Sequence, residues 1–294
     1  MVWHTVPMYH PDSYALDVLA RLLTDGKTTP FYEVLVEEDE VAPGARMSNA
    51  SEELAGRMTL SVRAFSGMDL DRVMASVERA FQRFEEEGVT PQELARVKAG
   101  TETDFYRGLS SALGKAFQIA QYAIFAGSPD YVQEDLQRTL DVTAEDVLRV
   151  YDTYLNEKLF VATSFVPRGQ PELILEGSEQ AQVVIEPIVQ GAEAEFVVQR
   201  GEERTPGGSF DRSVEPPYGQ APTLRAPEVW TTSLDNGVRV LGIEDREIPL
   251  VQFELRLKGG QLLDHPDRVG VANLLAESMI AGTASKTPEE LEQA

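Results

Sequence analysis

The chain has 294 residues, of which 42% are hydrophobic and 8% are aromatic, and this composition supports a packed core rather than global disorder. Its 49 acidic residues outnumber 26 basic ones, and the formal net charge of -23 disfavours binding to nucleic acid or to anionic membranes. The absence of cysteine excludes disulfides, thiolate metal sites and cysteine nucleophiles. No run of about 18 apolar residues is present, so membrane insertion is not expected. The first residues lack the basic and apolar regions of a signal peptide.

The first block, residues 1–166, contains both strand and helix patterns. Strands are expected at Val2–Val6, Met58–Phe65 and Leu159–Val166. The spacing of apolar residues predicts helices at 12–25, 29–38 and 70–87, with Asp12 or Ser13 as the first cap and with Gly26 and Gly88 as stops.

Two short motifs in this block predict where further helices begin. Thr90 followed by Pro91 and Glu93 is typical of a capping box, and Thr143 with Asp146 repeats the arrangement. The helix after Thr90 is expected to break near Gly108. Alternation of strands and helices indicates an α+β domain with a layered antiparallel or mixed sheet packed with helices. Residues 1–166 are long enough to form one complete domain.

The second block, residues 167–227, is acidic, contains many Pro and Gly residues and lacks helical periodicity. We interpret it as a linker between domains. Short edge strands are possible interpretations of Val183–Ile185 and Phe196–Val198.

The third block, residues 228–294, is predicted to be the truncated start of a second domain. A hairpin is expected from strands at Val229–Leu234 and Val238–Ile243 around the turn Asp235-Asn236-Gly237. A third strand is expected at Leu250–Leu257, then a helix that carries Asn273, and finally a helix that Thr287 begins. Too few strands are present to complete the sheet of a domain.

The order and spacing of these motifs resemble the pitrilysin/insulinase family of zinc metallopeptidases. In the third block the resemblance rests on Leu234–Val240, Pro249–Val251, Gly259-Gly260, Gly270–Ala272 and Gly282-Thr283. In the first block, which resembles the other recurring domain of the family, it rests on His10–Asp12, Ala15–Leu19, Asp25–Thr29, Leu35–Glu38 and Thr143–Val147. The resemblance implies α+β domains of one fold, arranged as two halves around a peptide chamber.

The resemblance also implies where functional residues would lie. An active half of such a peptidase carries H-x-x-E-H, in which the two His residues bind zinc and the Glu acts as the base, and a further Glu ligand lies downstream. Here the His positions fall on Asn273 and Glu277 and the base position on Ala276. The Arg and Tyr of the other half, seven residues apart, help to hold the substrate, and their positions fall on Val36 and Pro43. No catalytic residue and no metal ligand is therefore assigned to this chain, and zinc is expected only in the full-length family member.

The resemblance favours a non-catalytic middle section of an insulinase-like peptidase, which forms chamber wall and inter-half linker. The alternative is a non-catalytic subunit that pairs with a separate catalytic chain. The expected partners are the rest of the same peptidase or that catalytic homologue, together with peptide substrates. A bacterial periplasmic or envelope location is the compartment that the resemblance favours.

Several other residues have both a functional and a structural interpretation. His4, His10 and His265 lack the i, i+4 spacing of a helical zinc site, so surface or capping roles are preferred. A metal site at Asn273 and Glu277 is disfavoured because an amide is a poor zinc ligand. One group of aromatic residues could line a peptide groove, although core packing is preferred: Phe105, Tyr106, Phe117, Tyr122 and Phe125.

Overall fold

The computed structural model describes residues 1–182, Val214, Gly219, Thr223 and residues 226–292. One compact unit comprises residues 1–178 with residues 247–294, and the other comprises residues 179–246. The three blocks expected from the sequence, 1–166, 167–227 and 228–294, stay a prediction. The possible strands at Val183–Ile185 and Phe196–Val198 lie outside the described residues.

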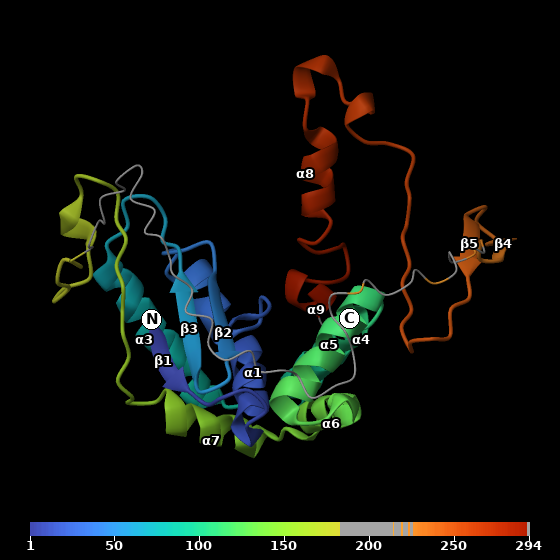
Figure 1. Cartoon of the computed structure of the whole chain (residues 1–294). Coiled ribbons are helices and arrows are strands. Elements are labelled where there is room, and N and C mark those ends of the chain that lie inside the picture. Colours follow the sequence, from blue (N-terminus) through green and yellow to red (C-terminus); the bar gives the residue numbers. More distant parts are fainter. Residues whose placement is uncertain (183–213, 215–218, 220–222, 224–225, 293–294) are drawn as a thin grey trace. The chain divides into compact units, whose positions relative to one another are not determined.

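A three-stranded antiparallel sheet forms the centre of the first unit (Figure 1). Its strands are β1 (Val2–Thr5), β2 (Ala45–Ser51) and β3 (Gly56–Val62), in the order β1-β3-β2. The expected strands at Val2–Val6 and Met58–Phe65 are confirmed. β2 is polar and was not predicted, because Met47 alone among its residues is buried.

The strand expected at Leu159–Val166 is wrong. It is reduced to one bridge, in which Val161 exchanges backbone hydrogen bonds of 2.9 and 3.0 Å with Val2. Leu159 and Phe165 are 98% and 90% exposed, so burial of their side chains does not stabilise a longer strand here.

Residues 1–178 form these helices, in chain order: α1 (Pro11–Thr24), α2 (Pro30–Tyr32), the π-helix η1 (Glu33–Glu38), α3 (Leu70–Glu87), α4 (Pro91–Gly108), α5 (Ala112–Gln121), the π-helix η2 (Tyr122–Ala126), the 3-10 helix η3 (Pro129–Tyr131), α6 (Val132–Asp141), α7 (Ala144–Tyr154) and the 3-10 helix η4 (Pro171–Leu173). The capping boxes of Thr90 and Thr143 are confirmed, as are the break at Gly108 and the stop at Gly88, whose φ is 71°. The expected cap of α1 is wrong, because the His10 imidazole, rather than Asp12 or Ser13, accepts the N–H of Asp12 at 3.1 Å.

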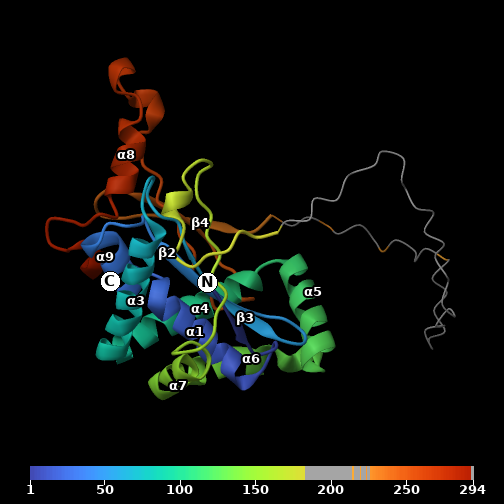
Figure 2. The same ribbon diagram turned by 90° about the vertical axis from the view of Figure 1, so that its left-hand side faces the viewer.

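The core lies between one face of the sheet and α1, α3 and α7. Trp3, Met58 and Leu60 contribute from the sheet, and Leu16 and Leu19 contribute from α1. The ring of Trp3 meets that of Phe81 on α3 edge-on, with the ring centroids 6.1 Å apart. α1 and α7 pack against each other (Figure 2). The expected α+β class is thus confirmed, with a closed core in the first unit.

The residues from 226 to 246 contain one antiparallel hairpin. Its strands are β4 (Val229–Ser233) and β5 (Arg239–Ile243), joined by the Asn236-Gly237 turn. Gly237 has a φ of 82°, which favours glycine. The predicted hairpin is confirmed.

Residues 247–292 contain short helices: η5 (Gln261–Leu263), η6 (Pro266–Arg268), α8 (Val271–Ser278) and α9 (Pro288–Glu292). The predicted helices at Asn273 and after Thr287 are confirmed. The strand expected at Leu250–Leu257 is wrong, since this described segment pairs with no other described strand and so lacks the ladder of hydrogen bonds that a strand needs. Among the described helices, none is long and apolar enough to cross a membrane.

Candidate functional site

The helix that carries the degenerate zinc motif is α8, and a side chain fixes its start. Gly270 precedes the helix with a φ of 102°. The carboxylate of Asp264 accepts the N–H of Gly270 at 2.9 Å and the N–H of Ala272 at 3.2 Å. A carboxylate at this end of a helix satisfies free N–H groups and the helix dipole. The sequence analysis missed Asp264 because it lies six residues before Gly270, outside the usual capping position.

The three motif residues on α8 do not fit a zinc ion. Asn273, Ala276 and Glu277 are all exposed, and Asn273 and Glu277 share a helix face at i, i+4 spacing. These side chains offer a neutral amide, a methyl group that cannot bind a metal, and one carboxylate. Zinc sites in proteins are built from several imidazole, thiolate or carboxylate ligands. Within residues 1–182 and 226–292, His, Cys, Asp and Glu form no group of three that could hold a metal ion. No reaction step through zinc is therefore derived for this chain.

The two positions where the family resemblance places substrate-holding residues, Val36 and Pro43, lie within and after the π-helix η1. Val36 is half-buried in η1, and Pro43 is exposed five residues beyond its end. Neither side chain can donate a hydrogen bond to a substrate. The wide turn is maintained by the N–H of Asp39, which donates to the carbonyl of Val34 at 2.9 Å. A π turn of this kind often marks a functional segment.

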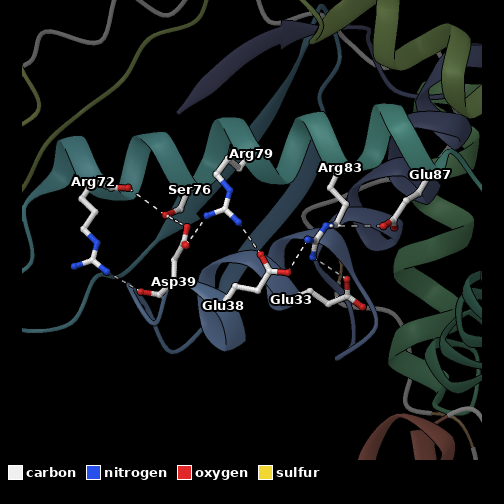
Figure 3. A network of polar contacts seen from close by, with 8 residues as sticks. All are labelled: Glu33, Glu38, Asp39, Arg72, Ser76, Arg79, Arg83 and Glu87. Atoms are coloured by element: carbon white, nitrogen blue, oxygen red, sulfur yellow. Dashed lines mark hydrogen bonds and ion pairs between the residues drawn. The ribbon is translucent and has the colours of Figure 1, made fainter.

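A network of ion pairs fastens η1 to α3 (Figure 3). The carboxylate of Glu38 accepts from Arg79 at 2.7 Å and from Arg83 at 2.6 Å. Asp39 accepts the Ser76 hydroxyl at 2.6 Å and also pairs with Arg79. The backbone carbonyl of Asp39 accepts a hydrogen bond from Arg72 at 3.1 Å. Arg83 also forms ion pairs with Glu33 at 3.2 Å and with Glu87 at 3.9 Å.

Two members of this network have pKa shifts that favour their charged forms, whereas burial raises the pKa of Glu33. The hydrogen bond from Ser76, followed by the contacts with Arg79, holds the pKa of Asp39 below its usual value despite partial burial. The hydrogen bond to Glu38 raises the pKa of Arg83. These two shifts favour the charged forms of Asp39 and Arg83, so the ion pairs help to position the η1 segment against α3. Charge patterning along α3 could have indicated it, because Arg79 and Arg83 are spaced i, i+4.

A second polar site, which the sequence analysis missed, is a hollow of about 610 Å³ lined by α1, β2, α4 and α6. In it, Asp17 accepts the Asn49 side-chain amide at 3.1 Å, and the Asn49 carbonyl accepts the Thr5 hydroxyl at 2.9 Å. Desolvation by the surrounding protein raises the pKa of Asp17 to about 7 against the effects of Asn49 and Arg21, while the residue as a whole stays exposed at the rim of the hollow. Arg21 pairs with Asp104 at 2.9 Å across the hollow.

The aromatic residues and histidines have mixed outcomes. Tyr122 is fully buried, as core packing predicts, but Phe117 and Phe125 are 68% and 41% exposed, and core packing is wrong for those two. Phe117 lies on α5, none of whose residues is buried, and Phe125 lies on η2, so apolar spacing alone does not bury these side chains. The capping interpretation is confirmed for His10 and for His265, whose imidazole accepts the N–H of Asp267 at 3.3 Å.

Comparison with known families finds a match for the first part of the chain. Residues 1–101 match the family model described as the peptidase M16 inactive domain. These residues, about a third of the chain, are thus similar to the inactive domain of M16 peptidases. The match includes β1, α1, η1 with its arginine network, and the sheet, and it confirms the recognition of a zinc-peptidase family from the sequence motifs.

Individual relatives cover the same half of the chain. The zinc protease PqqE of Helicobacter pylori is 24% identical over 158 residues, which are 52% of this chain and 35% of the relative. The chain thus spans about a third of the length of that relative. The structure of a protease from Helicobacter pylori is 22% identical over 52% of this chain and 37% of its own, with a TM-score of 0.47. The periplasmic protease PqqL from Escherichia coli is 18% identical over 53% and 17%, with a TM-score of 0.40.

Proposed function

We propose that this chain is a non-catalytic part of a zinc-dependent peptidase of the M16 family that acts on peptides. In this proposal residues 1–166 form wall of the peptide chamber, residues 167–227 link the two halves, and residues 228–294 begin a second domain. The proposed compartment is the bacterial periplasm or envelope, which follows from the family resemblance.

One observation carries the proposal. Residues 1–155 bury a core of their own, whereas large apolar side chains between residues 247 and 292 lie exposed, among them Val251 at 88%, Phe253 at 91% and Leu262 at 99%. Proteins rarely expose so many large apolar side chains together, because contact between apolar surface and water is unfavourable. We infer that further polypeptide packs on this segment and completes a domain core.

The lack of catalytic groups follows from the residues themselves. Asn273, Ala276 and Glu277 do not form a zinc site, and Val36 and Pro43 do not form the substrate contacts of the other half. Hydrolysis in the proposed peptidase therefore depends on residues outside this chain. The covering polypeptide either continues from this chain or, in the alternative, comes from a separate catalytic homologue.

The catalytic part of the proposal is tested with the purified chain. We expect substoichiometric zinc by elemental analysis and no cleavage of a quenched fluorescent peptide library. The variants Asn273→Ala and Glu277→Ala should behave like the wild type in both assays. Stoichiometric zinc together with chelator-sensitive cleavage that these substitutions abolish would refute it.

The packing part is tested with an environment-sensitive dye that binds exposed apolar surface. The double variant Phe253→Ser/Leu262→Ser should bind less dye than the wild type. Leu54→Ser serves as the matched control, since Leu54 is 88% exposed on the β2–β3 turn of the first unit. Equal dye binding by the double variant and the wild type would show that these side chains are already covered.

A further inference from the structure

The sheet of the first unit has a second face that is turned away from the core. Strand residues alternate between the two faces, and the burial of β1, β2 and β3 follows this alternation. The face opposite the core, here called the outer sheet face, carries Val2, His4, Arg46, Ser48, Ala50, Arg57, Thr59 and Ser61. Of these, His4, Arg46, Ser48, Arg57 and Ser61 are exposed.

The charge of this face is opposite to that of the chain as a whole. The chain has 49 acidic residues against 26 basic ones, yet no residue of β1, β2 or β3 is Asp or Glu. Arg46 and Arg57 lie on the face, and Arg63, the next residue in the alternation of β3, is exposed as well. Arg57 pairs with the exposed Glu52 at 2.9 Å. Within the part of the chain that the structure describes, Arg46 and Arg63 have no ion-pair partner.

The spacing of these cations suits an extended chain. Arg57 and Arg63 are six residues apart along β3 and its extension, which corresponds to a distance of roughly 20 Å along the strand. Arg46 lies directly opposite Ser61, between them along the strand. The hydroxyls of Ser48, Thr59 and Ser61 can each donate and accept hydrogen bonds. An extended segment of about seven residues has the length to reach from Arg57 to Arg63.

We propose that the outer sheet face docks an extended acidic polypeptide segment, whose carboxylates pair with Arg46, Arg57 and Arg63. Charge complementarity selects this occupant. A nucleic acid fits less well, because the face carries no Phe, Tyr or Trp ring on which bases could stack. The inference does not depend on the proposed peptidase role, since the face is the same whatever the rest of the protein does.

The experiment measures peptide binding to the full chain by fluorescence anisotropy. The probes are a labelled ten-residue peptide of alternating Glu and Thr, the same peptide with Lys for Glu, and a ten-nucleotide oligothymidine. The variants are Arg46→Gln, Arg57→Gln, Arg63→Gln and their triple combination. Arg239→Gln is the matched control, since Arg239 is an exposed strand arginine on β5 of the other unit. Circular dichroism verifies that every variant is folded.

We expect the Glu peptide to bind through the three arginines, whereas binding of the Lys peptide to acidic surface elsewhere on the chain should not weaken in the triple variant. Each single substitution on the face should weaken binding about two- to fivefold, as for an exposed ion pair, and the triple variant should weaken it at least about tenfold. Binding should weaken as the salt concentration rises from roughly 20 to roughly 150 mM, because the added ions screen the exposed charges. Arg46→Glu should bind the Glu peptide worse than Arg46→Gln, while Arg239→Gln should bind as the wild type does.

Two results would overturn the proposal: unchanged binding of the Glu peptide by the triple variant, or an equal loss in Arg239→Gln. Oligothymidine binding as tight as that of the Glu peptide would overturn the assignment of a polypeptide occupant. None of these results bears on the zinc and cleavage assays, so failure here is distinguishable from failure of the proposed peptidase role.

Discussion

The buried cluster around Asp135 offers a sharp test of how the first unit is held together. Its carboxylate accepts the hydroxyl of Tyr14 at 2.9 Å and that of Tyr122 at 2.7 Å, and so ties α1 and η2 to α6. Tyr14 and Tyr122 are 7% and 0% exposed. Burial is the main cause that raises the pKa of both phenols, so both remain protonated donors over the accessible pH range. Tyr14→Phe and Tyr122→Phe each remove one hydroxyl and keep the ring.

The expected loss follows from these contacts. The ring of Tyr122 packs against Tyr9 and Tyr131 with centroids 5.8 and 5.6 Å apart, and phenylalanine preserves that packing. What is lost is a hydrogen bond to a charged acceptor, which contributes about 1.5–3 kcal/mol. Each single variant leaves Asp135 with one phenolic donor, whereas the double variant leaves none. The double variant should therefore lose at least about 1 kcal/mol more than the sum of the singles.

The free energy of unfolding is measured in urea through the fluorescence of Trp3, which is 3% exposed in the core. A Trp230→Phe background removes the signal of the other tryptophan. Tyr106→Phe is the matched control, because the Tyr106 hydroxyl has no hydrogen-bond partner among the described residues, and it should change stability by less than about 0.5 kcal/mol. Single losses as small as that of the control, or strict additivity in the double variant, would refute the reasoning.

Three further predictions concern single side chains of the first unit. Asp39→Asn should lower the unfolding free energy by about 1 kcal/mol at pH 7. Because the folded pKa of Asp39 is depressed, this contribution exists above the unfolded pKa and should shrink as the pH falls below about 4 in urea titrations at several pH values. Asp17→Asn should act in the opposite sense. Because the folded pKa of Asp17 is about 7, the wild type loses stability as the pH rises from about 4 to 7. The variant should therefore have a higher melting temperature than the wild type at pH 8, and the difference should be smaller at pH 5. Thr143→Ala removes the cap that accepts the N–H of Asp146 at 3.1 Å and should cost about 1 kcal/mol, and an unchanged melting temperature would contradict that role.

The helix boundaries were predictable because short local contacts determine them. Thr90 and Thr143 each bond within three residues of the chain, and Gly88 ends α3 through its own backbone conformation. The hairpin around Asn236-Gly237 was predictable for the same reason, since a two-strand turn depends on neighbouring residues.

Strands without a local signal were not predictable. β2 is polar and exists because β3 pairs with its whole length, while the more apolar segment 250–257 forms no strand. Pairing partners far away in the sequence decide such cases, since a strand is stabilised by its neighbours rather than by its own backbone. His10 likewise replaced the expected cap of α1 through a contact that the usual cap residues do not indicate.

The candidate sites divide along the same line. That Asn273 and Ala276 lack the chemistry of a zinc ligand and a base follows from residue identity alone, because no fold can give an amide or a methyl group those properties. By contrast, the arginine network on η1, the raised pKa of Asp17 and the positive outer sheet face emerged only in three dimensions. Each of them depends on side chains from distant segments, and both the Coulomb energy and the desolvation of a charge are determined by distances in space rather than along the chain.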